Sequence, residues 1–186
     1  MGVCRGVRTT ARRDVDPDTS SAGEFDPFFR RTFPGVARTA ALVVGDMEGG
    51  QDMAQEAFTR VYQRWDRMAS EAVATNFVYR AAINVARSHL RKERVRTRLR
   101  LPHRIDAGMD EGDRTADRIT LARAIEGLSA RQRVCVALVD YAGFDADAAA
   151  DLLGLRASTI RVHLSRARRT LAERLATTFR GGPPDE

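Results

Sequence analysis

The sequence predicts an all-α protein with two small helical domains joined by a flexible linker. Apolar residues recur at intervals of three and four along most of the chain, which is the spacing of one helix face. No segment alternates apolar and polar residues for long enough to indicate a confident strand. A polar stretch without this periodicity separates two groups of helices, and 186 residues leave room for two small domains.

These observations divide the chain into five segments. Its start is polar and lacks apolar periodicity, as in a mobile tail, and its centre passes from arginine-rich to proline, glycine and acidic residues, as in a linker. We expect an N-terminal tail over residues 1–23, a first helical domain over 24–94, a linker over 95–116, a second helical domain over 117–179 and a C-terminal tail over 180–186.

The first helix of the first domain is expected to begin at Asp26 and Pro27, an N-cap followed by proline at the first helical position. Pro34 should kink or divide this helix, because proline removes a backbone hydrogen bond. Its apolar face consists of Phe25, Phe28, Phe29, Phe33, Ala37, Ala40 and Val44.

Two further helices should complete a three-helix bundle. One lies within 47–66, where Gly49 and Gly50 weaken the first turn. The other runs from about 72 to 94 and has a basic end. Their inward residues are Ala54, Phe58, Val61 and Trp65 in the first of these, and Phe77, Ala81, Val85 and Ala86 in the second.

The second domain should open with a helix over 117–127. Ser129 and Gln132 then form a capping box, in which each side chain bonds the other's backbone N–H, at the start of the next helix. Val134, Cys135, Leu138 and Val139 lie inside that helix, and Gly143 ends it.

A short helix and a longer basic helix follow. Asp145 can cap the short helix, which runs to Leu153, Gly154 makes a turn, and Ser158 can cap the long helix. The long helix has an apolar stripe of Ile160, Leu164, Ala167, Leu171 and Leu175.

Several classes of protein are excluded by composition. The longest apolar runs, such as 134–139, contain about six residues, far fewer than the roughly 20 that span a bilayer. The start of the chain has no apolar segment of signal-peptide length. We therefore expect a cytoplasmic protein without a membrane partner.

Cysteine and histidine usage gives no sign of an active site. Cys4 and Cys135 are far apart and have no metal-ligand spacing, which argues against a zinc site and a disulfide scaffold. No catalytic triad, metalloprotease motif or phosphate-binding loop includes His89, His103 or His163. We expect no enzyme activity, no cofactor and no metal.

Positive charge is concentrated in two stretches. The net charge is +6, yet residues 80–100 carry eight arginine or lysine residues against Glu93, and 156–180 carry seven arginines against Glu173. Solvated helix faces are the alternative interpretation, but a general preference for arginine does not explain the clustering. Arginine binds phosphates bidentately, so two cationic stretches indicate two contacts with one nucleic acid.

The short helix, glycine turn and long basic helix predict a helix-turn-helix, whose second helix lies in the DNA major groove. Residues near the start of that helix should meet base edges, and the later arginines should bind phosphates. Arg161 is the leading candidate for a base reader, with a phosphate contact as its alternative, and His163 either contacts a base or fills the rim. The candidate residues are Arg156, Ser158, Thr159, Arg161, Val162, His163, Ser165, Arg166, Arg168 and Arg169.

Motifs in both domains carry a family resemblance. The segments 152–155 (LLGL), 158–161 (STIR) and 165–168 (SRAR) resemble region 4 of the extracytoplasmic-function, or group 4, bacterial sigma factors. The segments 52–58 (DMAQEAF) and 79–84 (YRAAIN) are similar to region 2 of the same family. The resemblance covers about 25–94 and 117–176, in the family's order.

This resemblance implies a region 2 three-helix bundle and a region 4 helix-turn-helix domain. It implies a sigma factor that binds core RNA polymerase, directs promoter-specific initiation at minus-35 and minus-10 elements, and helps to melt the latter. The partners implied are the clamp helices and flap of core polymerase, promoter DNA and an inhibitory anti-sigma factor. Asp52, Gln55, Glu56 and Phe58 match the surface that docks on the clamp helices of the largest subunit.

The family reads and opens the minus-10 element along the third helix. Phe77 and Tyr79 are candidates to stack on displaced bases, although Phe77 is more typical of bundle core. The matching residues are Arg80, Asn84, Arg87, Ser88, Arg91 and Lys92.

Three positions depart from the family's pattern. Ser88 stands where many relatives have Asp, Ala148 where the family usually has Glu, and Phe77 where Trp is common. The alternative function is a stand-alone helix-turn-helix transcriptional regulator, which should bind palindromic DNA as a dimer without polymerase.

Overall fold

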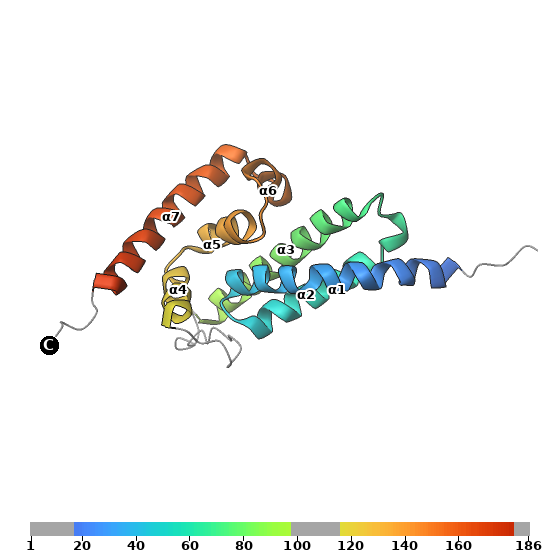
Figure 1. Cartoon of the computed structure of the whole chain (residues 1–186), viewed down its shortest axis with the longest axis horizontal. Coiled ribbons are helices and arrows are strands. Elements are labelled where there is room, and N and C mark those ends of the chain that lie inside the picture. The colour runs from blue at the N-terminus through green and yellow to red at the C-terminus, as the bar shows by residue number, and fades with distance from the viewer. Residues whose placement is uncertain (1–16, 98–115, 181–186) are drawn as a thin grey trace, which may run out of the picture.

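The computed structural model describes residues 17–97 and 116–180, and all regular structure in these residues is helical (Figure 1). The prediction of an all-α fold is confirmed. The first group of helices is α1 (Pro17–Val44), α2 (Met47–Tyr62), the short 3-10 turn η1 (Trp65–Arg67) and α3 (Glu71–Thr97). The second group is α4 (Ala116–Glu126), α5 (Ala130–Val136), the π-helical segment η3 (Ala137–Tyr141), α6 (Ala146–Leu153) and α7 (Ala157–Arg180).

The first helix begins earlier than predicted. Because α1 starts at Pro17, the prediction of a tail was wrong for residues 17–23. Asp26 is not an N-cap, because it lies inside α1 and its carboxylate accepts a hydrogen bond from Arg30 at 2.9 Å. Pro17 is the first residue of α1, and proline is favoured in the first turn of a helix, so this earlier proline suits the start.

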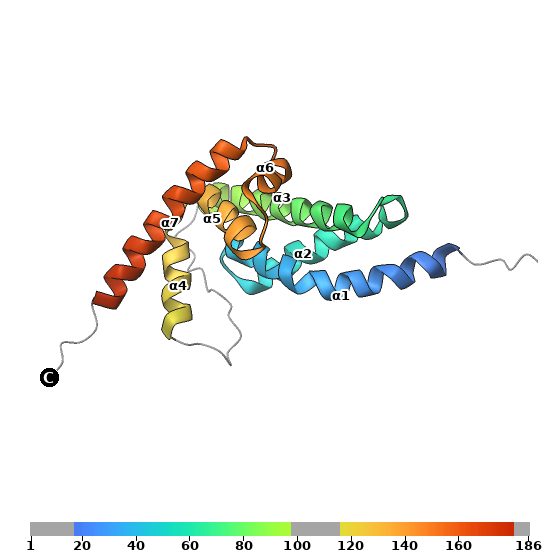
Figure 2. The same ribbon diagram turned by 45° about the horizontal axis from the view of Figure 1, so that its top comes forward.

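Pro34 does not divide α1. It removes one backbone hydrogen bond, but Phe28 on one side and Val36 on the other are both buried in the core. Packing of the apolar face on both sides of the proline therefore supports a continuous helix. Figure 2 shows α1 as one unbroken ribbon.

The predicted linker is shorter at both ends. α3 continues to Thr97 and α4 already begins at Ala116, so residues 95–97 and 116 are helical. The rest of the predicted linker, 98–115, lies outside the described residues, as do 1–16 and 181–186.

An aromatic cluster at one end of the first bundle joins α1 to α2 and η1. The ring of Phe58 lies 4.9 Å from that of Phe29 and 5.8 Å from that of Phe28, measured between centroids. Trp65 lies 5.0 Å from Phe28 and 5.2 Å from Phe25. Such tilted and edge-on pairs stabilise a core beyond the area they bury, and they confirm the apolar stripes predicted for the first two helices.

Gly50 allows the backbones of α1 and α2 to approach closely. A Cβ atom at this position would lie 2.6 Å from the carbonyl oxygen of Ala37 and 2.6 Å from the backbone nitrogen of Ala41. Asp46 caps α2 by accepting a hydrogen bond from the Gly49 N–H. The glycine pair therefore weakens the helix locally but permits its packing and its cap.

The predicted signals of the second domain are mostly confirmed. Ser129 and Gln132 form the capping box, and Asp145 accepts from the Ala148 N–H at 2.7 Å. Gly143 and Gly154 have φ of 80° and 64°, a region that favours glycine.

The cap predicted at Ser158 is wrong. Ser158 is the second residue of α7, and the carbonyl of Arg156 accepts the first bonds of that helix, from Thr159 and Ile160. After the turn at Gly154 the chain becomes helical at Ala157, one residue before Ser158, so Ser158 lies inside the helix and not at its cap.

The two domains pack against each other. Tyr79 of α3 is only 9% exposed, and its ring meets that of Phe144 edge-on at 5.0 Å. The Arg80 guanidinium donates a hydrogen bond to the carbonyl oxygen of Asp151 at 2.7 Å. In both views α6 lies beside α3, and α7 runs along the outside (Figures 1 and 2). We call these two contacts the domain seam.

Substitution of Gly50 tests the close approach of α1 and α2. Helix propensity alone would stabilise Gly50→Ala by about 1 kcal/mol. We expect instead a decrease of about 1–3 kcal/mol in the free energy of unfolding, because backbone atoms of α1 occupy the space. Urea unfolding followed by circular dichroism measures it.

Gly49→Ala is the matched control, since its Cβ would meet only the movable Asp46 carboxylate. Its propensity gain and a perturbed cap, each about 1 kcal/mol, should nearly cancel. A Gly50→Ala protein more stable than the wild type would contradict the close approach.

Substitution of Phe144 tests the domain seam. Phe144→Ala should increase the radius of gyration of the full chain in small-angle X-ray scattering while leaving the helix content unchanged. Burial raises the pKa of Tyr79, and its hydrogen bond with Thr39 opposes this rise, so loss of burial should lower that pKa. Leu155→Ala, at an exposed residue of the same domain, is the control. An unchanged radius and pKa would show that the ring contact does not hold the domains together.

Candidate nucleic-acid interface

The six residues predicted to bind minus-10 DNA are all exposed and follow the length of α3. Their spacing of three and four residues places them along one side of the helix. Residues such as Ala74, Val78 and Ala82 are buried in the bundle. The structure thus brings together Arg80, Asn84, Arg87, Ser88, Arg91 and Lys92.

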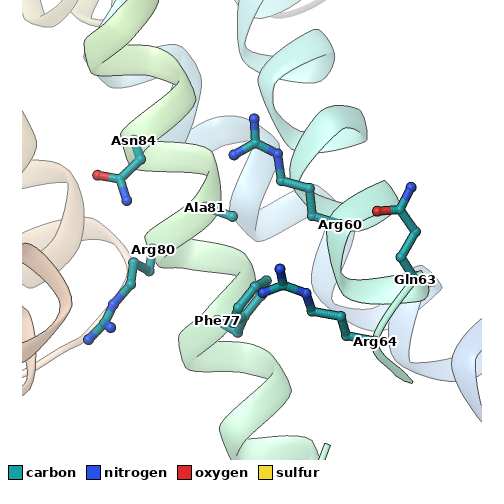
Figure 3. Close-up of a pocket in the computed structure, with 7 residues that line it drawn as sticks. All are labelled: Arg60, Gln63, Arg64, Phe77, Arg80, Ala81 and Asn84. Carbon is teal, nitrogen blue, oxygen red and sulfur yellow. The ribbon is translucent and has the colours of Figure 1, made fainter. Parts of the chain in front are cut away.

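A groove of about 400 Å³ opens beside this row, between α3 and the end of α2 (Figure 3). Phe77 is half-buried and lines the groove, whereas the sequence predicted it to face inward. The Arg64 guanidinium lies over the Phe77 ring, with its central carbon 5.6 Å from the ring centroid. The lining residues are Arg60, Gln63, Arg64, Phe77, Arg80, Ala81 and Asn84.

Sequence reasoning missed Arg60, Gln63 and Arg64 as groove residues. The groove exists only because the end of α2 packs against α3, which no local pattern predicts. Arg60 lies in the last turn of α2, and Gln63 and Arg64 follow three and four residues later, just past its end; this spacing was the available signal.

The chemistry of the groove suits single-stranded nucleic acid. Three arginines and no acidic residue line the groove, although the Arg80 guanidinium points away from it toward Asp151 (Figure 3). The amides of Gln63 and Asn84 can both donate and accept hydrogen bonds. An aromatic ring among cationic side chains offers a stacking platform and phosphate contacts together.

The outer face of α2 presents Asp52, Gln55 and Glu56 to solvent. Glu56 also pairs with Arg60, so this face adjoins the groove. Phe58 is 2% exposed and lies beneath the face in the aromatic cluster. A direct contact of Phe58 with a partner is therefore excluded in this structure, because its ring supports the helix from inside.

The predicted minus-35 residues lie along α7 and at Arg156 just before it. Ser158, Arg161, Val162 and Arg166 are exposed, whereas Thr159 and His163 are half-buried. Ser165, Arg168 and Arg169 are also exposed. The domain buries Ile160, Leu164 and Ala167, as the apolar stripe predicted.

Two arginines on one edge of α7 have carboxylate partners in preceding elements. Arg161 pairs with Asp147 of α6 at 3.0 Å. Arg168 donates two hydrogen bonds to Asp140 of η3, and this bonding raises the pKa of Arg168. Arg168 thus has a structural partner besides the DNA contact predicted for it.

The described residues show no reactive thiol, metal-ligand cluster or membrane-spanning helix. Burial raises the pKa of the Cys135 thiol to about 11, so this thiol is protonated and unreactive at neutral pH. Within 17–97 and 116–180, no histidine, cysteine and acidic residues gather as metal ligands. No helix in those ranges is long and apolar enough to cross a membrane.

Relatives of known structure share this fold. The chain is similar to the sigma factor RpoE from Bartonella quintana, crystallised with the anti-sigma factor NepR, with a TM-score of 0.71 and 22% identity. That match covers 82% of this chain and 97% of the other. CnrH, in complex with the cytosolic domain of CnrY, matches with a TM-score of 0.62 and 20% identity, covering 86% of this chain and 94% of CnrH.

Sequence comparison establishes the family. The family model of sigma-70 region 2 matches residues 28–96, and that of sigma-70 region 4 matches 118–171. The RNA polymerase sigma-E factor of Streptomyces avermitilis is 32% identical over 156 residues, which are 82% of this chain and 85% of the relative. The ECF RNA polymerase sigma factor SigM of Mycobacterium tuberculosis is 27% identical over 81% of this chain and 76% of its own length. The chain therefore belongs to the sigma-70 family of RNA polymerase sigma factors, in its extracytoplasmic-function group, and directs transcription initiation.

Proposed function

We propose that this sigma factor uses three separate surfaces for its three contacts. The outer face of α2 binds the clamp helices of core polymerase, the α3 row with its groove binds the minus-10 element, and α7 binds the minus-35 element. The observation that carries the assignment is the groove, because it joins an aromatic ring, three arginines and two amides beside the basic row. The chain has no catalytic activity of its own and acts in the cytoplasm, where the polymerase and the template are.

Melting of the minus-10 element is a trapping step at this groove. Extruding a base costs a few kcal/mol, and stacking returns about 1–3 kcal/mol per base. Phe77 offers a ring face once Arg64 moves aside, and Asn84 and Gln63 can bond base edges. Arginines along α3 hold the phosphates of the displaced strand, so the step needs no ATP.

Recognition of the minus-35 element uses the exposed side of α7. Ser158 and Arg161 lie near the start of the helix, where a recognition helix meets base edges. Arg166 and Arg169 follow farther along and suit phosphate contacts. Region 4 also contacts the flap of the polymerase in this assignment.

The two DNA elements require the domains to separate. By their names the elements lie about 25 base pairs apart, or roughly 85 Å of duplex. In the described structure Arg80 of the minus-10 row touches Asp151, seven residues before Ser158. Seven residues span at most about 25 Å, so the domain seam must open on the promoter.

An anti-sigma factor is a further proposed partner. Among proteins of this fold, RpoE is bound to the anti-sigma factor NepR. A partner that stabilised the domain seam would keep Arg80 away from promoter DNA. The alternative of a stand-alone regulator is not favoured, because region 2 as well as region 4 matches the sigma family.

The polymerase assignment is tested on the α2 face. The Gln55→Ala/Glu56→Ala double variant should weaken binding to core polymerase about tenfold or more, since it removes polar groups at the interface. Both residues are exposed, so circular dichroism should be unchanged. Affinity for purified core enzyme and run-off transcription from a promoter library are the measurements.

Glu126→Ala, an exposed carboxylate in α4, is the charge control. Wild-type affinity of the double variant for core polymerase would remove the α2 assignment. Failure of the wild-type chain to support any run-off transcription would remove the proposed function itself.

The minus-35 assignment is tested with two arginines of α7. Arg161→Ala should reduce discrimination between the selected element and a scrambled one by about 1–3 kcal/mol. Arg166→Ala should weaken binding to both duplexes alike and lower the salt dependence, as loss of one phosphate contact does. Competition binding by the reconstituted holoenzyme at several salt concentrations measures both. An equal loss on both duplexes for Arg161→Ala would contradict its role as base reader.

A further inference from the structure

We propose that Asp147 is a positioning residue that holds Arg161 for base reading and so determines the sequence preference at the upstream element. This inference rests on the proposed function of α7, and names a residue outside the recognition helix. Asp147 acts through Arg161 and needs no contact with DNA.

The contact that carries the proposal joins the two helices of the helix-turn-helix. Arg161 Nη2 lies 3.0 Å from Asp147 Oδ2, although the residues are fourteen positions apart. Both side chains remain largely exposed to solvent, with exposed fractions of 61% for Arg161 and 73% for Asp147. A guanidinium has five N–H donors. A guanidinium that gives one of them to a carboxylate can therefore still make a bidentate contact with guanine.

The cap and the buried side of α6 hold the Asp147 backbone in place. Asp145 caps α6 through the Ala148 N–H, and Ala149, Ala150 and Leu152 bury the inner side of that helix. Gly154, with φ of 64°, defines the turn into α7. Arginine loses considerable rotamer freedom when it binds. A partner on a rigid helix orders Arg161 before DNA arrives and reduces that loss.

Charge adds a second effect of the same carboxylate. The Asp147 carboxylate lies beside the surface proposed to face DNA, so it repels phosphates nearby. Binding through phosphates alone is therefore weakened, whereas a base contact through Arg161 is retained. Specificity increases when wrong sequences are disfavoured as well as the right one favoured.

The neighbouring pair of Arg168 and Asp140 differs from this arrangement. Asp140 is only 32% exposed and accepts two hydrogen bonds, which is typical of a contact that holds α7 on η3. Asp151 gives a matched control in α6, since it carries the same charge one turn later. In the part of the chain that the structure describes, its carboxylate makes no hydrogen bond or ion pair.

A double-mutant cycle in the holoenzyme tests the proposal. The full chain, with core polymerase, selects DNA from a library randomised at the upstream element, and the wild type, Asp147→Asn, Arg161→Ala, their combination and Asp151→Asn are compared. We expect Asp147→Asn to reduce discrimination about threefold to fivefold, as an exposed pair allows. The preference should weaken at the same base position of the upstream element that Arg161→Ala affects. The Asp147→Asn holoenzyme should bind scrambled DNA at least as tightly as the wild type does.

Two further results are expected from the cycle. Asp147→Asn should cause no additional loss in the Arg161→Ala background, because coupled residues are not additive. Asp151→Asn should leave the preference unchanged, and Asp147→Glu should retain most of it. Thermal unfolding of each variant reports whether the domain remains folded.

Three outcomes would overturn the inference. An unchanged preference in Asp147→Asn, or a loss of equal size in the Arg161→Ala background, removes the role of Asp147 while leaving Arg161 as the reader. If Asp151→Asn reduces discrimination by as much as Asp147→Asn does, the reduction comes from net charge and not from the contact with Arg161. If Arg161→Ala itself keeps the wild-type preference, both the inference and the assignment of the base reader fail, and normal polymerase binding by that variant keeps the sigma function.

Discussion

The packing of α2 against α1 determines where each functional surface of the first domain lies. Phe58 and Val61 must be buried against α1, and Gly50 lets the two backbones approach closely enough for this. A helix that buries one side presents the other to solvent, so Asp52, Gln55 and Glu56 face outward. The same packing ends α2 beside α3 and thereby forms the groove.

The domain seam holds the chain in a form that differs from the one we propose for the promoter-bound state. Tyr79 packs its ring against Phe144 in the seam, and its neighbour in sequence, Arg80, belongs to the row that we propose binds DNA. A residue proposed to recognise the promoter, Arg80, therefore also contacts the other domain. Under the proposed function, binding of promoter DNA competes with this contact, and a partner that prefers one of the two forms would shift the equilibrium between them.

Electrostatic pairs divide the arginines of α7 into two groups. Arg161 and Arg168 lie on the edge nearest α6 and η3 and have acidic partners there. Arg166 is exposed, and in the described ranges its guanidinium makes no hydrogen bond or ion pair, although its carbonyl oxygen accepts one from the Thr170 hydroxyl. Exposed arginines on one helix are thus not equivalent, because the elements that precede the recognition helix orient some and leave others free for phosphate.

The sequence by itself determined the helices, the caps at Ser129 and Asp145, and the two basic stretches, because these depend on residues close together in the chain. The family, too, was predictable from short motifs in their order. Tertiary structure alone decided that Tyr79 meets Phe144, that Arg64 covers Phe77, and that Asp147 reaches Arg161. Each of these contacts joins residues from different helices or turns, and their distances follow from how the helices pack rather than from the local pattern.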